Sequence, residues 1–243
     1  MSENDQLPER PDLTLIMPVF NERMTVERAI EQVLAVDLPI GSREVIVVDD
    51  GSTDGSSELL AALTEPANVS IHTHARNAGK GAAIRTGLAV ATGRFTAIVD
   101  ADLELDPADL GPLLVPLLQG EATVVFGARV FPKDSARKLR YLLGNKSVSI
   151  AANVLFRASL TDIMTAYKVM PTELFRSLPL RETGFGIEPE ITACLLQRGV
   201  SIKELPVHYE PRARKAGKKL TMLDGLRVMR TLLRYRFSSV RSS

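Results

Sequence analysis

The sequence contains few cysteine and aromatic residues and no long apolar run. Cys194 is the single cysteine, tryptophan is absent, and aromatic residues make up 5% of the 243 positions. One cysteine excludes an intramolecular disulfide framework, so we expect the protein in a reducing compartment. No uninterrupted apolar stretch reaches the roughly 18 residues that a membrane-spanning helix needs. The polar start MSENDQLPERPD lacks the apolar core of a secretory signal, which indicates a cytoplasmic location.

The sequence also has no excess of one charge. Its 30 basic and 29 acidic residues give a formal net charge of +1, so we expect no nucleic-acid partner. Basic residues gather only locally, between Arg212 and Arg241, where Asp224 is the single acidic residue. With 45% hydrophobic and 24% charged residues, the chain has the composition of a globular protein with one full core.

The first half of the chain alternates between two patterns. Apolar runs typical of buried strands alternate with helical patterns, in the order 13–21, 25–36, 43–50, 56–63, 69–77, 79–93 and 94–102. This order predicts an α/β fold whose mostly parallel central sheet has helices on both faces.

The second half of the chain is less regular. We expect strands at 122–130 and 201–209, the latter at an edge because of Pro206, and helices at 135–158 and 189–200. Three parts follow from these patterns, namely a flexible tail at 1–11, a single domain at 12–215, and a basic loop with an amphipathic helix at 216–243.

Carboxylates stand where two predicted strands end. Asp49 and Asp50 follow one strand, and Asp100 and Asp102 follow another. Ligands of such sheets bind beyond the carboxyl ends of the strands, so we expect these four residues around one crevice. On an extended segment Asp100 and Asp102 would point the same way and repel each other. A divalent ion completed by substrate phosphates would relieve that repulsion.

Alternative roles remain open for these acidic residues. Asp100 and Asp102 can also cap a following helix, although Asp106 with Pro107 at the first helical position fits that role better. Asp50 precedes the turn GST and can accept hydrogen bonds from a base or a ribose hydroxyl, whereas Asp54 is as well explained as a helix cap.

The segment RNAGKGAAIRTG is compatible with phosphate binding but does not require it. Gly79-Lys80-Gly81 lacks the third glycine of the dinucleotide fingerprint, and a helix that needs a flexible entry explains it equally well. Lys80 becomes a candidate phosphate-binding residue only if it lies beside the acidic crevice, where a nucleotide diphosphate would need a countercharge. His72 and His74 share one strand face without a third metal ligand, so we interpret them as ordinary strand residues.

The C-terminal segment has an amphipathic pattern with two interpretations. Its apolar residues recur at helical spacing at Met222, Leu226, Met229, Leu233 and Phe237, and its arginines at Arg227, Arg230 and Arg234. A terminal helix that packs on the core with a solvated charged face explains this pattern. A helix that lies on anionic lipid headgroups explains it as well.

The order of these motifs resembles that of the family 2 glycosyltransferases of GT-A fold, a Rossmann-like α/β fold. The resemblance extends from about Leu13 to Phe237 and rests on MPVFNE, VIVVDDGSTDGS, RNAGKGAAIRTGLAVATG, IVDADLELDP, GAR, TDIMTAYKVMP, GFGIEPEI and EPRARKAGKKLTMLDG. The last segment is similar to that of the polyprenyl-phosphate glycosyltransferases and dolichyl-phosphate mannose synthases. The membrane helices that follow this segment in some relatives are not found here.

The resemblance implies roles for individual residues. Those that match nucleotide-binding positions of the family are Pro18, Phe20, Glu22, Asp50, Lys80, Asp100 and Ala101. Asp102 matches the metal ligand of the D-x-D motif, and Glu104 stands where mannose synthases commonly carry a metal-binding glutamine. The positions that match phosphate-binding residues are Arg129, Arg212, Lys218 and Lys219. Ala166 and Lys168 replace the usual glycine and arginine, which leaves the donor sugar open.

The function implied by the resemblance is the inverting transfer of a sugar from a UDP- or GDP-linked donor to a polyprenyl phosphate, with Mg²⁺ or Mn²⁺. A phosphate acceptor is already ionised near neutral pH, so Asp162 and Glu190 would order the acceptor or its basic clamp. The enzyme would act as a peripheral protein at the cytoplasmic face of a membrane, and the sequence leaves homo-oligomers open.

Two other functions remain open. A soluble sugar or small hydroxylated acceptor would need a general base, for which Asp162 or Glu190 would have to serve. A catalytically silent nucleotide-sugar-binding or membrane-docking module would need neither a base nor a metal ion.

Overall fold

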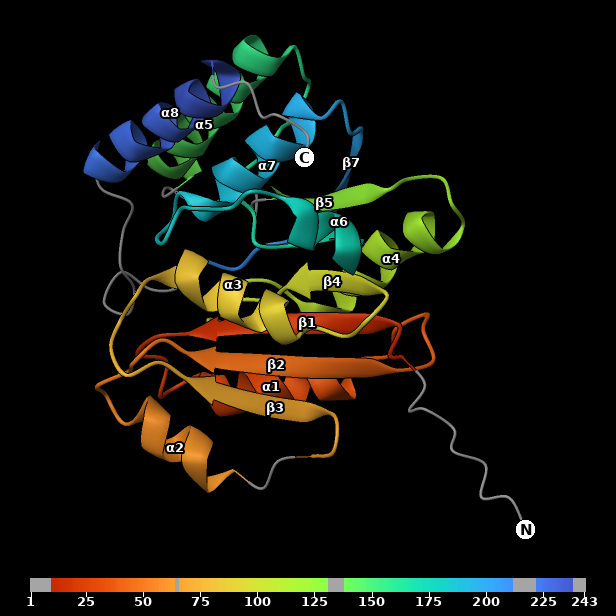
Figure 1. Ribbon diagram of the computed structural model, residues 1–243, viewed down its shortest axis with the longest axis vertical. Coiled ribbons are helices and arrows are strands. Elements are labelled where there is room, and N and C mark those ends of the chain that lie inside the picture. Colours follow the sequence, from red (N-terminus) through yellow and green to blue (C-terminus); the bar gives the residue numbers. More distant parts are fainter. Residues whose placement is uncertain (1–9, 64–65, 131–137, 212–221, 238–243) are drawn as a thin grey trace.

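The computed structural model describes residues 10–63, 66–130, 138–211 and 222–237. A seven-stranded sheet in the order β3-β2-β1-β4-β6-β5-β7 forms its centre (Figure 1). The strands are β1 (Leu13–Val19), β2 (Arg43–Asp49), β3 (Val69–Thr73), β4 (Phe95–Ile98), β5 (Val124–Val130), β6 (Lys168–Pro171) and β7 (Ile202–His208). The helices are α1 (Val26–Ala35), α2 (Ser56–Ala62), α3 (Lys80–Val90), α4 (Leu110–Leu118), α5 (Lys138–Phe156), α6 (Thr172–Ser177), α7 (Ile187–Gln197) and α8 (Met222–Phe237), with a short 3₁₀ turn at Pro107–Asp109.

The parallel strands of the first half confirm the predicted β-α-β units. β1 pairs in parallel with β2 and β4, and β2 pairs in parallel with β3. These strands are apolar without alternation because helices bury both of their faces. Their carboxyl ends therefore meet at one edge of the sheet, where the predicted aspartates lie.

The sheet contains one reversed strand that the sequence pattern did not indicate. β6 lies between β4 and β5 and is antiparallel to both. It has only four residues, too few for the periodicity of a strand to stand out from the surrounding sequence. β7 pairs in parallel with β5 and forms the edge of the sheet, as expected from Pro206.

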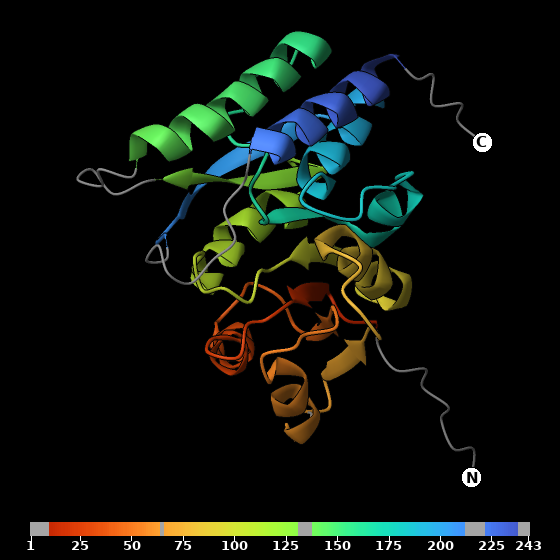
Figure 2. The same ribbon diagram turned by 90° about the vertical axis from the view of Figure 1, so that its left-hand side faces the viewer.

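Helices cover both faces of the sheet, as predicted. Helices α1 and α4 pack with side chains from one face, and α3, α6 and α7 pack with those of the other. Figures 1 and 2 show α5, α7 and α8 packed together at one end of the molecule, far from α2. The expected cap before α4 is present, because Asp106 accepts a hydrogen bond from the Ala108 backbone N–H at 2.9 Å.

Helix α8 buries a different face from the one that the apolar repeat predicted. Its buried side chains include Val228, Leu232 and Tyr235, whereas Leu233 and Phe237 of the predicted stripe are exposed. The helix packs on α5 and α7 through residues that lie beside that stripe. Among the helices that the structure describes, none has the length and apolar character required to cross a bilayer.

Candidate active site

Asp49 and Asp50, at the end of β2, organise the loops around the crevice. The Asp49 carboxylate accepts hydrogen bonds from the Ser52 backbone N–H at 3.1 Å and from the Ser52 hydroxyl at 2.6 Å. Asp50 is 2% exposed and accepts hydrogen bonds from the Ala78 N–H at 2.9 Å and the Gly79 N–H at 2.7 Å. Both carboxylates therefore fix backbone turns, and Asp50 joins β2 to the loop that precedes α3.

His74 belongs to this site, and its interpretation as an ordinary strand residue was wrong. It lies one residue beyond β3, with Nδ1 2.7 Å from Asp50 Oδ1 and Nε2 2.9 Å from the Thr86 hydroxyl. The two contacts hold the ring between β2 and α3. The spacing of the histidines does not predict this role, because the partners Asp50 and Thr86 come from other elements of the chain.

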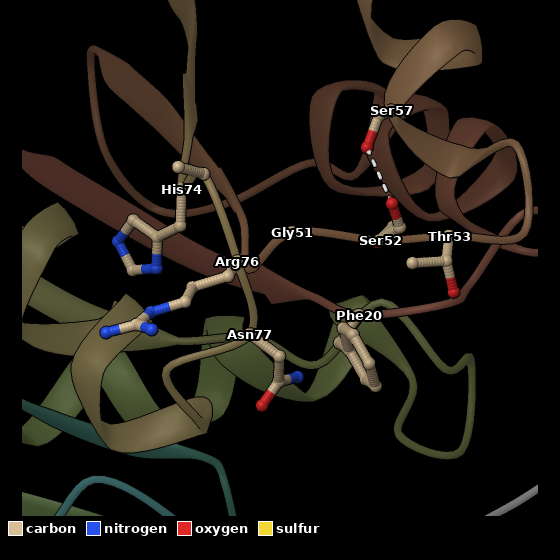
Figure 3. Close-up of a pocket in the computed structure, with 9 residues that line it drawn as sticks. Phe20, Gly51, Ser52, Thr53, Ser57, His74, Arg76 and Asn77 are labelled. Carbon is tan, nitrogen blue, oxygen red and sulfur yellow. Dashed lines mark hydrogen bonds between the residues drawn. The ribbon is translucent and has the colours of Figure 1, made fainter.

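A pocket opens beside His74 at the carboxyl ends of β1 and β2 (Figure 3). Its volume is about 410 Å³, and its lining consists of Phe20, Gly51, Ser52, Thr53, Ser57, His74, Ala75, Arg76 and Asn77. Gly51 has a φ of 69°, and a side chain there would collide with the backbone of Arg76. The pocket thus has the position, the size and the combination of one aromatic ring with polar walls that suit a nucleobase.

Of the residues expected at the nucleotide in and after β1, Phe20 lines this pocket, whereas Pro18 and Glu22 are not part of its lining. Pro18 pairs with Val48 within the sheet. The carboxylate of Glu22 accepts a hydrogen bond from the Thr25 hydroxyl at 2.8 Å. Thr25 precedes α1 as expected, but its side chain makes no capping hydrogen bond.

Lys80 connects Asp100, after β4, with a residue of α7 that the sequence did not single out. Its ammonium lies 2.7 Å from a carboxylate oxygen of Asp100 and 2.7 Å from one of Glu188. Burial alone would lower the pKa of Lys80, but these two carboxylates raise it above its ordinary value. The second oxygen of Glu188 is buried and has no hydrogen-bond partner among the residues that the structure describes. Glu188 was missed because only the fold brings α7 to Lys80.

The start of α3 is a packed helix entry and not an open phosphate cradle. The carbonyl of Thr183 accepts hydrogen bonds from the backbone N–H groups of Gly81 at 2.7 Å and Ala82 at 3.3 Å. Side chains at Gly79 or Gly81 would collide with the backbone at Glu182 and Thr183. Of the two interpretations of this segment, the glycines therefore support the one based on backbone packing.

The segment that follows β4 turns, so the expected extended arrangement of Asp100 and Asp102 was wrong. β4 ends at Ile98, and Leu103 adopts a left-handed φ of 59°. Ala101 is buried in the core, which separates the two aspartates. Lys80 already provides a permanent countercharge for Asp100, so a metal ion is not its only source of neutralisation.

A second cluster contains Arg129 at the end of β5. Its guanidinium holds Asp162 through Nε at 2.6 Å and through a terminal nitrogen at 2.8 Å. Burial alone would raise the pKa of Asp162, but the hydrogen bonds and charge of Arg129 lower it, so the carboxylate is ionised at neutral pH. Glu204 fixes the same turn by accepting a hydrogen bond from the Asp162 N–H at 3.0 Å.

Asp102 and Glu104 offer oxygen ligands that fit a hard divalent ion. Asp102 accepts a hydrogen bond from the Glu104 backbone N–H at 3.1 Å, which keeps the two residues in one turn. Within the described part of the chain, no three His, Cys, Asp or Glu side chains form a complete metal site. Two carboxylates that depend on substrate phosphates for the remaining ligands suit Mg²⁺ or Mn²⁺ and do not suit structural zinc.

Glu190, in α7, contacts α8 and the loop that precedes α7. It is fully buried and accepts hydrogen bonds from the Glu182 N–H at 2.8 Å, the Tyr235 hydroxyl at 2.6 Å and Arg234 at 2.9 Å. These contacts hold α8 against α7 and the preceding loop. The predicted residues Arg212, Lys218 and Lys219 lie outside the described part of the chain.

Lys168, at the start of β6, is a buried cation near both clusters. Its ammonium donates hydrogen bonds to the carbonyls of Ile163, at 3.0 Å, and Thr165, and lies 4.6 Å from the centre of the Phe126 ring. Burial lowers the pKa of Lys168 to about 7, against the opposing effect of Glu188 and Asp162. Lys168 thereby ties down the turn that carries Asp162.

Comparison with known proteins agrees with this architecture. The family model described as glycosyl transferase family 2 matches residues 14–178. Glycosyltransferase AglJ of Haloferax volcanii is 27% identical over 207 residues, which cover 85% of this chain and 65% of that protein. Dodecaprenyl-phosphate galacturonate synthase of Rhizobium johnstonii is 34% identical over 143 residues, which cover 55% of this chain and 42% of that protein. This chain thus spans less than two thirds of either relative.

A solved structure shares the fold. It is glucosyl-3-phosphoglycerate synthase from Mycobacterium tuberculosis in complex with Mn²⁺, uridine diphosphate and phosphoglyceric acid. The TM-score is 0.72 and the sequence identity 21%, with 93% of this chain and 79% of that chain covered. This similarity confirms the GT-A fold that the motifs implied.

Proposed function

The chain belongs to glycosyl transferase family 2, and we propose that it transfers a sugar from a nucleoside-diphosphate sugar to a polyprenyl phosphate. An oxygen of the acceptor phosphate attacks the anomeric carbon as the bond to the nucleoside diphosphate breaks, with inversion. The products are a polyprenyl-phosphate sugar and a nucleoside diphosphate. The name of one relative, dodecaprenyl-phosphate galacturonate synthase, supports this choice of acceptor.

In this proposal the nucleobase of the donor occupies the pocket beside His74. Phe20 provides an apolar surface there, and Asp50 and His74 keep the walls in place. The solved neighbour with bound uridine diphosphate favours a UDP-linked donor over a GDP-linked one. Lys80 is paired with Asp100 and Glu188, and in this proposal its ammonium would also contact the diphosphate of the donor.

Asp102 and Glu104 would hold Mg²⁺ or Mn²⁺, which when bound neutralises charge on the leaving diphosphate. Arg129 would hold the acceptor phosphate, because Asp162 fixes its guanidinium in one orientation at the same edge of the sheet. Arg212 and Lys218 or Lys219 would complete the phosphate clamp.

One observation carries the choice of a phosphate acceptor. Each carboxylate expected as a base is occupied, since Asp162 pairs with Arg129 and Glu190 receives hydrogen bonds from α8 and the loop before α7. An ionised acceptor phosphate needs no base to attack, whereas a hydroxyl does. The geometry therefore agrees best with an acceptor that is already an anion.

We also propose that the enzyme acts at the cytoplasmic face of a membrane. Helices α5 and α8 pack side by side and expose apolar residues, namely Ile150 and Val154 of α5 and Leu233 and Phe237 of α8. Exposed apolar side chains next to the basic residues of α8 suit an anionic lipid surface.

A soluble acceptor is the second candidate. The phosphoglyceric acid in the solved neighbour favours it, because that molecule also has a phosphate but is not a lipid. Its hydroxyl would need a base, and Asp162 or Glu190 would first have to leave its present partners.

The test offers purified protein radiolabelled UDP- and GDP-linked sugars with a polyprenyl phosphate, with 3-phosphoglycerate, or with no acceptor. We expect label in the organic phase only with the polyprenyl phosphate and Mg²⁺ or Mn²⁺. The matched control is Asp102→Asn, which retains the size of the side chain and should abolish the signal. Label that appears only on 3-phosphoglycerate would replace the lipid proposal with the soluble one.

A further inference from the structure

The loop with the predicted metal carboxylates is attached to the end of β7. Leu105 forms an isolated antiparallel bridge with Tyr209, and the Glu210 backbone N–H donates to the Glu104 carbonyl at 2.9 Å. β7 itself pairs with β5, which ends near Arg129. One short segment after β7 therefore touches both the loop after β4 and the strand that carries Arg129.

Tyr209 makes the side-chain contacts of this junction. Its hydroxyl donates a hydrogen bond to Glu104 Oε2 at 2.8 Å, and the guanidinium carbon of Arg129 lies 5.3 Å from its ring centre. The side chain is nearly buried, at 5% exposure. A buried phenol needs a partner for its hydroxyl, and an arginine over its ring face is attracted by the ring's electrons.

We propose that Tyr209 is a positioning residue that aligns the carboxylate of Glu104 with the guanidinium of Arg129. The hydroxyl restricts Glu104 to one rotamer, and the ring supports Arg129 on the side that Asp162 does not hold. The inference rests on the proposed function, in which Glu104 serves the donor's metal ion and Arg129 the acceptor phosphate. Tyr209 thus fixes the distance between the two substrates.

The two halves of the Tyr209 side chain have separable effects. Tyr209→Phe removes the hydrogen bond to Glu104 but keeps the ring beneath Arg129. Tyr209→Leu removes both contacts. Loss of an outer partner of a metal ligand weakens metal binding by roughly 10- to 100-fold.

The chain provides a matched control in α8. Tyr235 also donates its hydroxyl to a glutamate, Glu190, at 2.6 Å, and the Arg234 guanidinium carbon lies 5.0 Å from its ring centre. Tyr235, Glu190 and Arg234 thus repeat the combination of tyrosine, glutamate and arginine found at Tyr209, but they join α8 to α7. Tyr235→Phe therefore measures what the loss of such a hydroxyl does to the fold alone.

The experiment measures binding without turnover, in two calorimetric titrations. In the first, Mn²⁺ is titrated into the protein in the presence of UDP. In the second, farnesyl phosphate alone is titrated into the protein. We expect Tyr209→Phe to weaken Mn²⁺ binding about tenfold and to leave farnesyl phosphate binding unchanged. Tyr209→Leu should weaken both, and Tyr235→Phe should weaken neither while lowering the melting temperature. Thermal unfolding of each variant confirms that it is folded.

Wild-type Mn²⁺ affinity in Tyr209→Phe would overturn the inference, even if Tyr209→Leu fails to fold. Equal losses of Mn²⁺ affinity in Tyr209→Phe and Tyr235→Phe would also overturn it, because the effect would then come from the fold. If the wild-type protein with UDP binds no Mn²⁺, the proposed function itself fails. Failure of the proposed function is thereby distinguished from failure of the role given to Tyr209.

Discussion

In the proposed function, the donor half and the acceptor half of the site are organised by different interactions. Around the donor pocket, the buried carboxylates Asp49 and Asp50 accept hydrogen bonds from backbone and hydroxyl groups in turns. In the second half, Asp162 holds Arg129, which belongs to another element of the chain. The donor half is thus held through its backbone, whereas the acceptor half depends on a pair of charged side chains.

Breaking the Arg129–Asp162 pair should have the largest effect. With Asp162→Asn we expect catalytic efficiency for the polyprenyl phosphate to fall about a hundredfold, because Arg129 loses its fixed orientation. The KM for the donor should remain unchanged, as steady-state kinetics with each substrate varied will show. The control is Glu173→Gln. Glu173 pairs with Arg10 at 3.5 Å, but the side chains of Arg10 and Glu173 are 51% and 69% exposed, so the loss of this ion pair should have little effect. A rise in the donor KM alone would contradict the separation of the two halves.

Removing Asp50 tests the donor half. Asp50→Ala should lower the free energy of unfolding by about 2 kcal/mol, because the N–H groups of Ala78 and Gly79 lose their charged acceptor. Urea denaturation measures this change, and titration with UDP should show weaker binding. Asp37→Ala, at an exposed position, should change stability by less than about 0.5 kcal/mol. Equal stability of the two variants would show that the turn does not depend on Asp50.

Lys168 introduces a pH dependence into the acceptor half. Its folded-state pKa of about 7 lies below the ordinary lysine value of 10.5, so between these values the unfolded chain binds more protons than the folded one. Stability should therefore rise with pH in this window, by about 2 kcal/mol between pH 7 and pH 9, relative to Lys168→Met. Urea denaturation at several pH values measures this difference, and parallel curves for the two proteins would refute it.

The exposed apolar residues of α8 give the smallest expected effect. Phe237→Ser should weaken binding to anionic vesicles about fivefold, because the ring is 78% exposed and available to lipid. Vesicle flotation measures the bound fraction. Met24→Ser serves as the control, because Met24 is 90% exposed and precedes α1 in the donor half. Similar losses for both variants would show that the binding is not specific to α8.

Much of the fold was predictable from the sequence. Continuous apolar runs that end in turn residues are typical of a parallel strand that is buried on both faces, so β1, β2 and β4 were predictable. β6 was missed because four residues carry too little pattern. The buried face of α8 was missed because an apolar stripe does not show which neighbours α5 and α7 offer.

The position of a candidate site residue was predictable where it follows a strand, as for Asp100 and Asp102 after β4, although the turn that these two residues form was not. The contacts of a site residue were not predictable where its partners come from distant elements. Glu188 reaches Lys80 from α7, and Tyr209 reaches Glu104 across 105 positions. The sequence shows each of these residues as an unremarkable side chain, because only tertiary packing brings it to its partner.

The reversed direction of β6 has a consequence for redesigning the enzyme. Because β6 is antiparallel to β4 and β5, its amino end opens at the edge where its neighbours end. The turn at 161–167 therefore lies at the edge of the sheet where β5 brings Arg129. Glu204 accepts hydrogen bonds from the backbone N–H groups of Thr161 and Asp162, so a graft of this turn from another transferase would have to bring its Glu204 partner with it.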